Sequence, residues 1–421
     1  MATTITSVSE ICGAAKRASR VLGTLGAEVK NAALEAIADA LIEQTPEILE
    51  ANARDLETGR EAGLSSALMD RLSLDGARVR AIAEGTRKIA ALPDPVGEVI
   101  DGFRLPNGLD VRKVRVPLGV VAVVYEARPN VTIDAAALCL KSGNAIVLRG
   151  SSSAAHSNEV LAGVAGRAAV SAGIPEGALS LVAGGGREEL AELATQTGVV
   201  DLIVPRGGEG LKAALKGVAT VPVIYAASGN CHVYVDRSAD LRAAQEIVVN
   251  AKVQRPGVCN AAETLLVHAA VAQTFLPHVL PALHDAGVTL HADERARAAV
   301  PGLTMRPATE ADWATEYLSL DMAVQVVDSL EAAIEHINTY GSGHSEAIVT
   351  GETQSARAFG LGVDAACVYV NASTRFTDGG EFGMGAEIGN STQKLHARGP
   401  IGLRELCTFK YLIEGAGHIR V

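Results

Sequence analysis

One cysteine stands in a context that suits a catalytic nucleophile. Cys259 closes a turn-rich stretch, QRPGVC, which follows a helical pattern that ends near Lys252 and precedes Asn260. A thiol beside a turn, with Arg255 close in the chain, has reasons for a lowered pKa, and the thiolate is the reactive form. The competing interpretation is a small buried hydrophobic residue, as most cysteines are. Cys259 is therefore a candidate nucleophile.

An amide side chain is the second candidate. Asn130 follows a β-type run and precedes a helical pattern, within the stretch YEARPN. Asn at such a position often caps the first turn of a helix. Its amide could instead donate a hydrogen bond to negative charge that develops on an oxygen during a reaction. Both interpretations stay open at this point.

Glycine-rich turns follow four of the predicted strands. In a doubly wound sheet, ligands bind outside the C-terminal edge, where free backbone N–H groups bind phosphate. The chain contains neither GxGxxG nor GxxxxGK[ST], so each turn alone is more typical of ordinary chain reversal than of a phosphate site. Several turns on one sheet edge favour a dinucleotide site. They occupy residues 149–153, 184–186, 206–210 and 228–230.

The remaining cysteines and the histidines give weaker signals. Cys139 lies in an apolar helical run and Cys367 begins a strand pattern, so both are predicted to pack in the core, while Cys231 stays open as a reactive thiol. The ten histidines show neither HExxH nor clustered ligand spacing, so no metal site is predicted.

The elements that must position these residues alternate between strands and helices. The first hundred residues are predicted to be helical, with Leu34, Ile37 and Leu41 on one apolar stripe. Charged and apolar residues alternate over 110–116, which predicts a two-faced strand, and the apolar run Leu118 to Tyr125 predicts a strand buried on both faces.

Two α/β layers follow from this alternation, because strand–helix repeats form parallel sheets. The tail from Arg375 is glycine-rich. The expected strands are 145–148, 179–182, 200–204 and 221–226 in the first layer, 233–235, 264–267, 324–327, 346–349 and 367–370 in the second, and 408–413 in the tail; the helices include 132–141, 156–172, 269–286 and 330–338.

Composition narrows the class of protein. The 421 residues are 48% hydrophobic and carry a net charge of −11, which is typical of a globular protein and argues against nucleic acid as a partner. The chain has no apolar run near the roughly 20 residues that span a bilayer. Met1 to Thr4 show no secretory leader, and the six cysteines lie far apart without CxxC, which together predict a cytoplasmic protein.

Longer stretches resemble the aldehyde dehydrogenase superfamily over nearly the whole chain and, within it, the γ-glutamyl phosphate reductase family. The most specific stretch is VDSLEAAIEHINTYGSGHSEAI at 327–348. Supporting stretches are VVYEARPNVT, VLRGSSSAAHSN, QRPGVCNA and EFGMGAEIGNSTQKLHARGPIGL.

The resemblance implies an α/β fold of the aldehyde dehydrogenase type. A Rossmann-type cofactor-binding domain would span 1–230, with an oligomerisation ribbon at about 101–117. A catalytic domain would span 231–374, and residues 375–421 would return to the cofactor domain and add an oligomerisation strand. The family also implies a homo-oligomer, dimer or tetramer, and functional coupling to glutamate 5-kinase.

The resemblance also assigns roles to matching residues. Cys259 would be the nucleophile, and Asn130 would form the oxyanion hole together with the backbone N–H of Cys259. In the cofactor site, Arg149, with Ser151 beside it, would meet the adenosine ribose or its 2′-phosphate. The resemblance further implies that Gly207 and Gly208 lie near the cofactor pyrophosphate and that Glu316 holds the nicotinamide ribose.

The implied reaction is NADPH-dependent reduction of L-glutamyl 5-phosphate to L-glutamate 5-semialdehyde through a Cys259 thioester. Hydrolytic relatives carry a Glu, in a Glu-Leu-Gly-Gly block, that activates water. Residues 226–230 read AASGN here. The absence of this Glu disfavours a hydrolytic aldehyde dehydrogenase. The stretch at 327–348 disfavours both a hydrolytic and a CoA-acylating aldehyde dehydrogenase. A catalytically silent nucleotide-binding scaffold is the remaining alternative.

Substrate recognition needs cations for the phosphate and the α-carboxylate, and an anion for the ammonium group. Each candidate could equally form a structural ion pair. The candidate cations are Arg128, Arg255, Arg375 and Arg398, and the candidate anions are Glu126, Asp378 and Glu387.

Overall fold

The computed structural model of the chain describes residues 7–184, 186–225 and 228–420. The predicted absence of a leader at Met1 to Thr4 concerns residues outside this range. Residue 185 of the turn at 184–186 and residues 226 and 227 of the segment 226–230 also lie outside it. Two compact units are present: Met1–Tyr225 with Met384–Gly389 and Ile401–Val421, and Ala226–Gly383 with Asn390–Pro400.

The first unit begins with helices, as predicted. Leu34, Ile37 and Leu41 are buried on α2, which packs against α5 and α7. Ser7 caps α1 in a capping box with Glu10, which satisfies backbone N–H groups at the helix start. The helices are α1 (Val8–Leu22), α2 (Ala27–Glu43), α3 (Thr45–Glu61), α4 (Ser66–Leu72) and α5 (Gly76–Ala91).

A four-stranded parallel sheet forms the centre of this unit, in the order β5–β4–β3–β6. The chain starts in β3 (Val120–Tyr125), steps outward to β4 (Ala145–Arg149) and β5 (Leu179–Leu181), then returns to β6 (Leu202–Arg206) on the other side of β3. The segments that follow β3 and β6 therefore flank a topological switch point, where such sheets bind ligands. The covering elements are α6 (Pro129–Lys141), η1 (Ser152–Ala154), α7 (Ala155–Ser171), α8 (Arg187–Ala194) and α9 (Glu209–Val218).

The prediction of a strand at 221–226 is wrong, because the described residues 221–225 form no strand. Only an isolated bridge joins Val223 to Ile203. Pro222 has no backbone N–H to donate, so it interrupts the ladder and leaves only its carbonyl to accept from Ile203.

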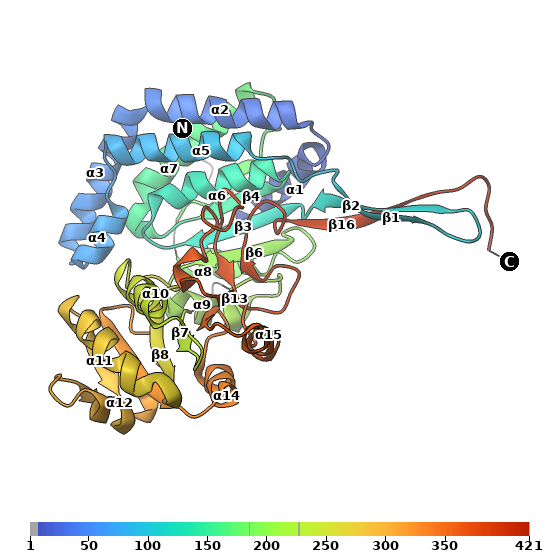
Figure 1. Cartoon of the computed structure of the whole chain (residues 1–421). Coiled ribbons are helices and arrows are strands. Elements are labelled where there is room, and N and C mark those ends of the chain that lie inside the picture. The colour runs from blue at the N-terminus through green and yellow to red at the C-terminus, as the bar shows by residue number, and fades with distance from the viewer. Residues whose placement is uncertain (1–6, 185, 226–227, 421) are drawn as a thin grey trace. The chain divides into compact units, whose positions relative to one another are not determined.

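Three antiparallel strands form a ribbon that extends from the first unit (Figure 1). They are β1 (Val99–Arg104), β2 (Asp110–Pro117) and β16 (Cys407–Glu414). β16 pairs with β2 along its whole length, from Cys407 opposite Pro117 to Glu414 opposite Asp110. Large apolar side chains are exposed on it, at Phe103, Phe409, Tyr411 and Ile413.

The second unit contains a seven-stranded parallel sheet, in the order β10–β9–β11–β8–β7–β12–β13. Its strands are β7 (Cys231–Val235), β8 (Ala262–His268), β9 (Thr289–Ala292), β10 (Arg306–Pro307), β11 (Asp321–Val327), β12 (Ser345–Val349) and β13 (Cys367–Val370). Its helices are α10 (Leu241–Val253), α11 (Ala269–Asp285), α12 (Glu294–Ala299), α13 (Glu310–Trp313), α14 (Leu330–Tyr340) and α15 (Thr353–Gly362).

The tail from residue 375 divides between the two units. Residues up to 383 and the whole segment Asn390–Pro400, which begins with β14 (Asn390–Ser391) and ends with β15 (Gly399–Pro400), belong to the second unit. Met384–Gly389 and the residues from Ile401 onward belong to the first. Asn260 holds η2 (Thr374–Phe376), because its amide nitrogen donates to the carbonyl of Thr377 at 2.8 Å. None of the helices among the described residues is long and apolar enough to cross a membrane.

Candidate active site

Cys259 lies in a loop, residues 254–261, between α10 and β8. The loop is at the edge where the parallel strands β7 and β8 begin, since Cys231 is in register with Ala262. All six cysteines lie in the described residues, and Cys259 alone has a partly exposed side chain. Cys259 therefore stays the candidate nucleophile.

A glycine presses directly against the main chain of Cys259. A Cβ on Gly229 would overlap the carbonyl carbon and oxygen of Cys259, so only glycine fits. The N–H of Gly229 donates to Oε1 of Glu316 at 2.6 Å. From the sequence, Gly229 was one residue of a glycine-rich turn in a possible dinucleotide site, and only the fold brings it beside Cys259.

Hydrogen bonds hold the loop on both sides of Cys259. The Cys231 thiol donates to the carbonyl oxygen of Cys259 at 3.1 Å. Burial raises the pKa of Cys231 well above its usual value, so this thiol stays protonated and serves as a donor. On the other side, Thr374 Oγ1 donates to the carbonyl of Asn260 at 2.7 Å. Cys231 is thus a support for the loop.

A buried ion pair joins the chain on either side of the loop. Nζ of Lys252, at the end of α10, lies 2.5 Å from Oε2 of Glu263 on β8, and neither side chain is exposed. Glu263 Oε1 also accepts from the backbone N–H of Leu318 at 3.2 Å. Burial raises the pKa of Glu263 to about 7 and lowers the pKa of Lys252. The sequence analysis did not identify this ion pair. The feature that could have indicated it is a Lys and a Glu in a helix and a strand that are otherwise mostly apolar.

Two of the four candidate arginines share the electrostatic surroundings of Cys259. Arg375 Nε donates to Gln254 Oε1 at 2.8 Å. Burial lowers the pKa of Arg375, as does the neighbouring charge of Arg255, whereas Asp378 and a Cys259 thiolate act in the opposite direction. Arg375 therefore places positive charge near the thiol, and Arg255 lies close to Arg375.

The other two candidate arginines have different surroundings within their own units. Arg398 Nη2 donates to Asp364 at 2.8 Å, and Lys394 pairs with the other oxygen of that carboxylate. Arg128 is the N-cap residue of α6, without a hydrogen bond from its side chain to the helix.

Asn130 is the second residue of α6 and does not cap it. Arg128 occupies the N-cap and Pro129 the first helical position, so the N-cap interpretation of Asn130 is wrong. Asn130 Nδ2 donates instead to Oδ2 of Asp134 at 2.9 Å. A planar amide has a second N–H, which this bond leaves for another acceptor.

The turn after β6 is occupied by a carboxylate. Gly208 is the N-cap of α9, and its N–H donates to Oε2 of Glu126 at 2.9 Å. A Cβ on Gly207 would come within 2.7 Å of the Glu126 carboxyl carbon and 2.8 Å of Leu211. A pyrophosphate at this turn would therefore have to displace Glu126, which had been named as a partner for the substrate ammonium.

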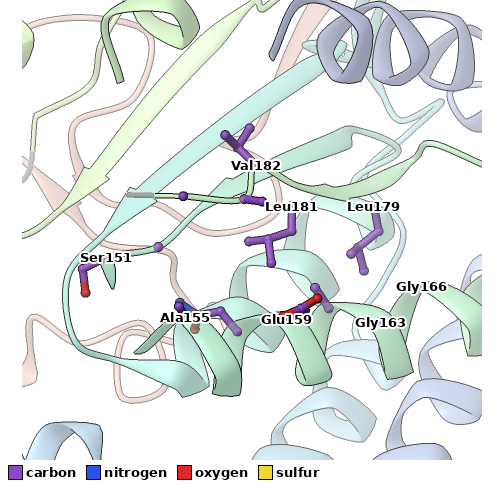
Figure 2. Close-up of a pocket in the computed structure, with 13 residues that line it drawn as sticks. Ser151, Ala155, Glu159, Gly163, Gly166, Leu179, Leu181 and Val182 are labelled. Atoms are coloured by element: carbon purple, nitrogen blue, oxygen red, sulfur yellow. The ribbon is translucent and has the colours of Figure 1, made fainter. Parts of the chain in front are cut away.

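A cavity of about 450 Å³ lies between α7 and β5 in the first unit (Figure 2). Ser151, Glu159, Gly163 and Gly166 line it, and the small residues along α7 leave room for a flat ring. The neighbouring Arg149 is buried and donates to the carbonyl of Gly186 at 2.5 Å, and its Nε has no partner among the described residues. These features fit the adenosine part of a nicotinamide dinucleotide.

Buried polar residues of the stretch 327–348 make structural contacts in this fold. Glu346 is buried and accepts from the backbone N–H of His232 at 2.7 Å, while His232 Nδ1 lies 2.9 Å from the same oxygen. Burial lowers the pKa of His336 to about 3, so this ring is neutral. The stretch that carries the resemblance thus shapes the sheet edge behind the loop.

Comparison with known proteins assigns the family. The aldehyde dehydrogenase family model matches residues 1–299. The chain is 59% identical over 406 residues to a γ-glutamyl phosphate reductase of Moorella thermoacetica, covering 96% of this chain and 97% of that protein. It is 56% identical over 413 residues to that of Thermobifida fusca, covering 98% of each. The chain belongs to the γ-glutamyl phosphate reductase family.

A solved structure agrees with this assignment. The crystal structure of γ-glutamyl phosphate reductase from Thermotoga maritima matches with a TM-score of 0.96 and 46% identity, covering 99% of this chain and 100% of that one. The predicted α/β fold of the aldehyde dehydrogenase type is confirmed.

Proposed function

We propose that the chain is an oxidoreductase of proline biosynthesis that reduces L-glutamyl 5-phosphate to L-glutamate 5-semialdehyde and releases phosphate. The observation that carries this is the near full-length identity of 59% to a γ-glutamyl phosphate reductase. The partly exposed Cys259 in a tightly held loop supports the covalent route.

Cys259 is proposed to act as a thiolate. Its sulfur attacks the acyl carbon, the bond from that carbon to the phosphate oxygen breaks, and a thioester remains on Cys259. A bound nicotinamide cofactor supplies the hydride that reduces a thioester to an aldehyde, and the thiolate is then released.

Charge that develops on the acyl oxygen needs hydrogen-bond donors. We assign this role to the free N–H of the Asn130 amide and to the backbone N–H of Cys259. Donors oriented in advance toward such an oxygen are among the largest contributions to catalysis.

Arg255 and Arg375 are proposed to bind the phosphate of the substrate, since Arg375 brings positive charge near Cys259 and Arg255 adds its charge beside Arg375. Arg128 and Arg398 are the candidates for the α-carboxylate. Arg398 would have to share or exchange its pairing with Asp364 to do this.

The cofactor is proposed to be NADPH. Arg149 and Ser151 would hold the adenosine ribose and its 2′-phosphate, Gly207 and Gly208 the pyrophosphate, and Glu316 the nicotinamide ribose. Glu159 in the same cavity would favour a 2′-hydroxyl over a 2′-phosphate, so the preference depends on Arg149. Arg149→Ala should therefore raise KM for NADPH more than KM for NADH.

The described part of the segment 226–230 supports reduction over hydrolysis. Ser228, Gly229 and Asn230 contribute no carboxylate, and the Asn230 amide donates to the carbonyls of Trp313 and Tyr340. Residues 226 and 227 lie outside the described part. Ser228, Gly229 and Asn230 thus do not supply the carboxylate that activates water in hydrolytic relatives, which favours survival of a thioester until it is reduced.

The assembly and location are further proposals. The exposed apolar side chains of the β1–β2–β16 ribbon favour a homo-oligomer, dimer or tetramer, formed through this sheet. We place the enzyme in the cytoplasm and expect functional coupling to glutamate 5-kinase, because an acyl phosphate is labile and is best used where it is made.

The test runs the reaction in reverse. L-Glutamate 5-semialdehyde, NADP and inorganic phosphate are mixed, and formation of reduced cofactor is followed by absorbance, with Cys259→Ala as control. Turnover that requires phosphate and is lost in the variant supports the proposal. Turnover without phosphate would identify a hydrolytic enzyme, and turnover that requires CoA a CoA-acylating one. No turnover by folded protein that binds NADP would indicate a silent scaffold.

A further inference from the structure

The Asn130–Asp134 pair lies at the switch point of the first sheet. The two residues are four apart on α6, so their side chains share one face of the helix. Nδ2 of Asn130 lies 2.9 Å from Oδ2 of Asp134. α6 follows β3, whose neighbour β6 ends at Arg206, and these elements lie together in the first unit (Figure 1).

An ionised carboxylate can only accept hydrogen bonds, and this selects one orientation of the amide. The NH₂ end of Asn130 must face Asp134, so the carbonyl end is turned away from it. Because the amide is planar, the direction of the second N–H is fixed as well. Without the carboxylate, Asn130 could turn over and present its oxygen, which repels a developing negative charge.

Arg206 favours the ionised form of Asp134. Burial raises the pKa of Asp134 to about 6, while the hydrogen bond from Asn130 and the charge of Arg206 oppose this rise. Arg206 is itself confined, because a Cβ on Gly389 would come within 2.9 Å of its Nη1. At neutral pH Asp134 is therefore mostly a carboxylate that accepts from Asn130.

We propose that Asp134 is a positioning residue that orients the Asn130 amide toward the oxyanion. This inference rests on the proposed function, since it requires that Asn130 is an oxyanion donor. Asp134 acts through Asn130 and forms no bond to substrate in this role. The same two residues could otherwise be an ordinary helix pair, which stabilises a helix only slightly.

A double-mutant cycle separates the two explanations. Variants Asn130→Ala, Asp134→Ala and the double variant are compared with the parent enzyme by kcat and by KM for cofactor and substrate. Asn130→Ala should lower kcat about 100-fold, the usual effect of losing one oxyanion donor. Asp134→Ala should lower kcat about 10-fold with KM nearly unchanged, because the donor is present but poorly oriented. The double variant should equal Asn130→Ala, because Asp134 has no other role.

Two further variants keep the test decisive. Asp134→Asn preserves the shape if Asp134→Ala does not fold, and it should lose less activity because its Oδ1 still accepts. Glu50→Ala removes the carboxylate of an exposed i,i+4 pair with Arg54 and should leave kcat unchanged.

Each outcome supports or overturns one statement. Two outcomes would overturn the positioning role and leave the proposed function intact. In the first, the losses of activity from the two single variants add up in the double variant. In the second, Asp134→Ala and Asp134→Asn keep full activity while Asn130→Ala is impaired. An unimpaired Asn130→Ala would overturn the oxyanion role of Asn130 and the inference with it.

Discussion

Cys259 and Asn130 are held in place by different kinds of contact. The Cys259 loop is fixed through its main chain by Gly229, by the Cys231 thiol and by Thr374, with a buried ion pair across its ends. The orientation of the Asn130 amide depends on a single carboxylate. A nucleophile needs a fixed position, and many contacts can share in fixing it. An amide donor also needs a fixed orientation of its plane, which a single neighbouring acceptor determines.

The largest effect should come from the nucleophile itself. Cys259→Ala should lower kcat by roughly 10⁴-fold or more, since no other group can form the thioester. Steady-state turnover measures this, with unchanged thermal unfolding as the control for folding. Substantial turnover by a folded Cys259→Ala protein would contradict covalent catalysis at this residue.

The ion pair across the loop should matter for stability. Lys252→Met leaves the Glu263 carboxylate buried and unpaired, which should cost about 3–5 kcal/mol in the free energy of unfolding. The double variant Lys252→Met/Glu263→Leu should recover most of that loss, because both charges are gone. Urea unfolding provides the comparison, and equal losses in the single and double variants would argue against a role of the charge.

Gly229 tests whether the loop is held through its main chain. Gly229→Ala should displace the main chain of Cys259 and lower kcat about 100-fold, as small misplacements do. Gly302→Ala is the matched control, because its Cβ would meet open space in the same unit. The rate of Cys259 alkylation should change together with kcat in Gly229→Ala and should stay unchanged in Gly302→Ala. A fully active Gly229→Ala would show that the main chain of the loop can shift without loss of catalysis.

The smallest effect concerns the amide. Protonation of Asp134, whose pKa is about 6, lets the carboxyl donate to the Asn130 oxygen and allows the amide to turn. As pH falls through 6, kcat should drop a few-fold in the parent enzyme, by the loss of an oriented donor. The charged group that acts on Asp134 is Arg206, which favours the carboxylate. Asp134→Asn should lack this drop, and identical profiles of the two proteins would contradict the prediction.

The sequence predicted the elements whose pattern is local. The apolar run at β3 and the stripe on α2 have clear periods, and the turn around Cys259 is marked by Pro256 and Gly257. The strand at 221–226 failed because its composition outweighed the missing N–H of Pro222. Asn130 was open to a capping interpretation because the helix start could not be placed to one residue.

The contacts that hold the candidate site could not be predicted, because some join distant parts of the chain and the others depend on burial that the sequence does not show. Gly229 meets Cys259 and Asn260 meets Thr377 only after the second sheet has formed. Lys252 and Glu263 are close in sequence, but their pairing depends on both being buried on adjacent elements. Asp134 was overlooked because a carboxylate in the first turns of a helix is a common stabilising residue.

The pairing of β2 with β16 also bears on when the protein can assemble. β16 is the last strand along the chain, and it forms the whole second edge of β2 some three hundred residues away. During synthesis, β2 emerges early and exposes that edge to solvent until residues 407–414 leave the ribosome. An unpaired edge readily joins other strands, so the growing chain is open to wrong partners during this interval. Completion of the ribbon is therefore a late step, and only chains that have been translated through β16 present the finished surface to one another.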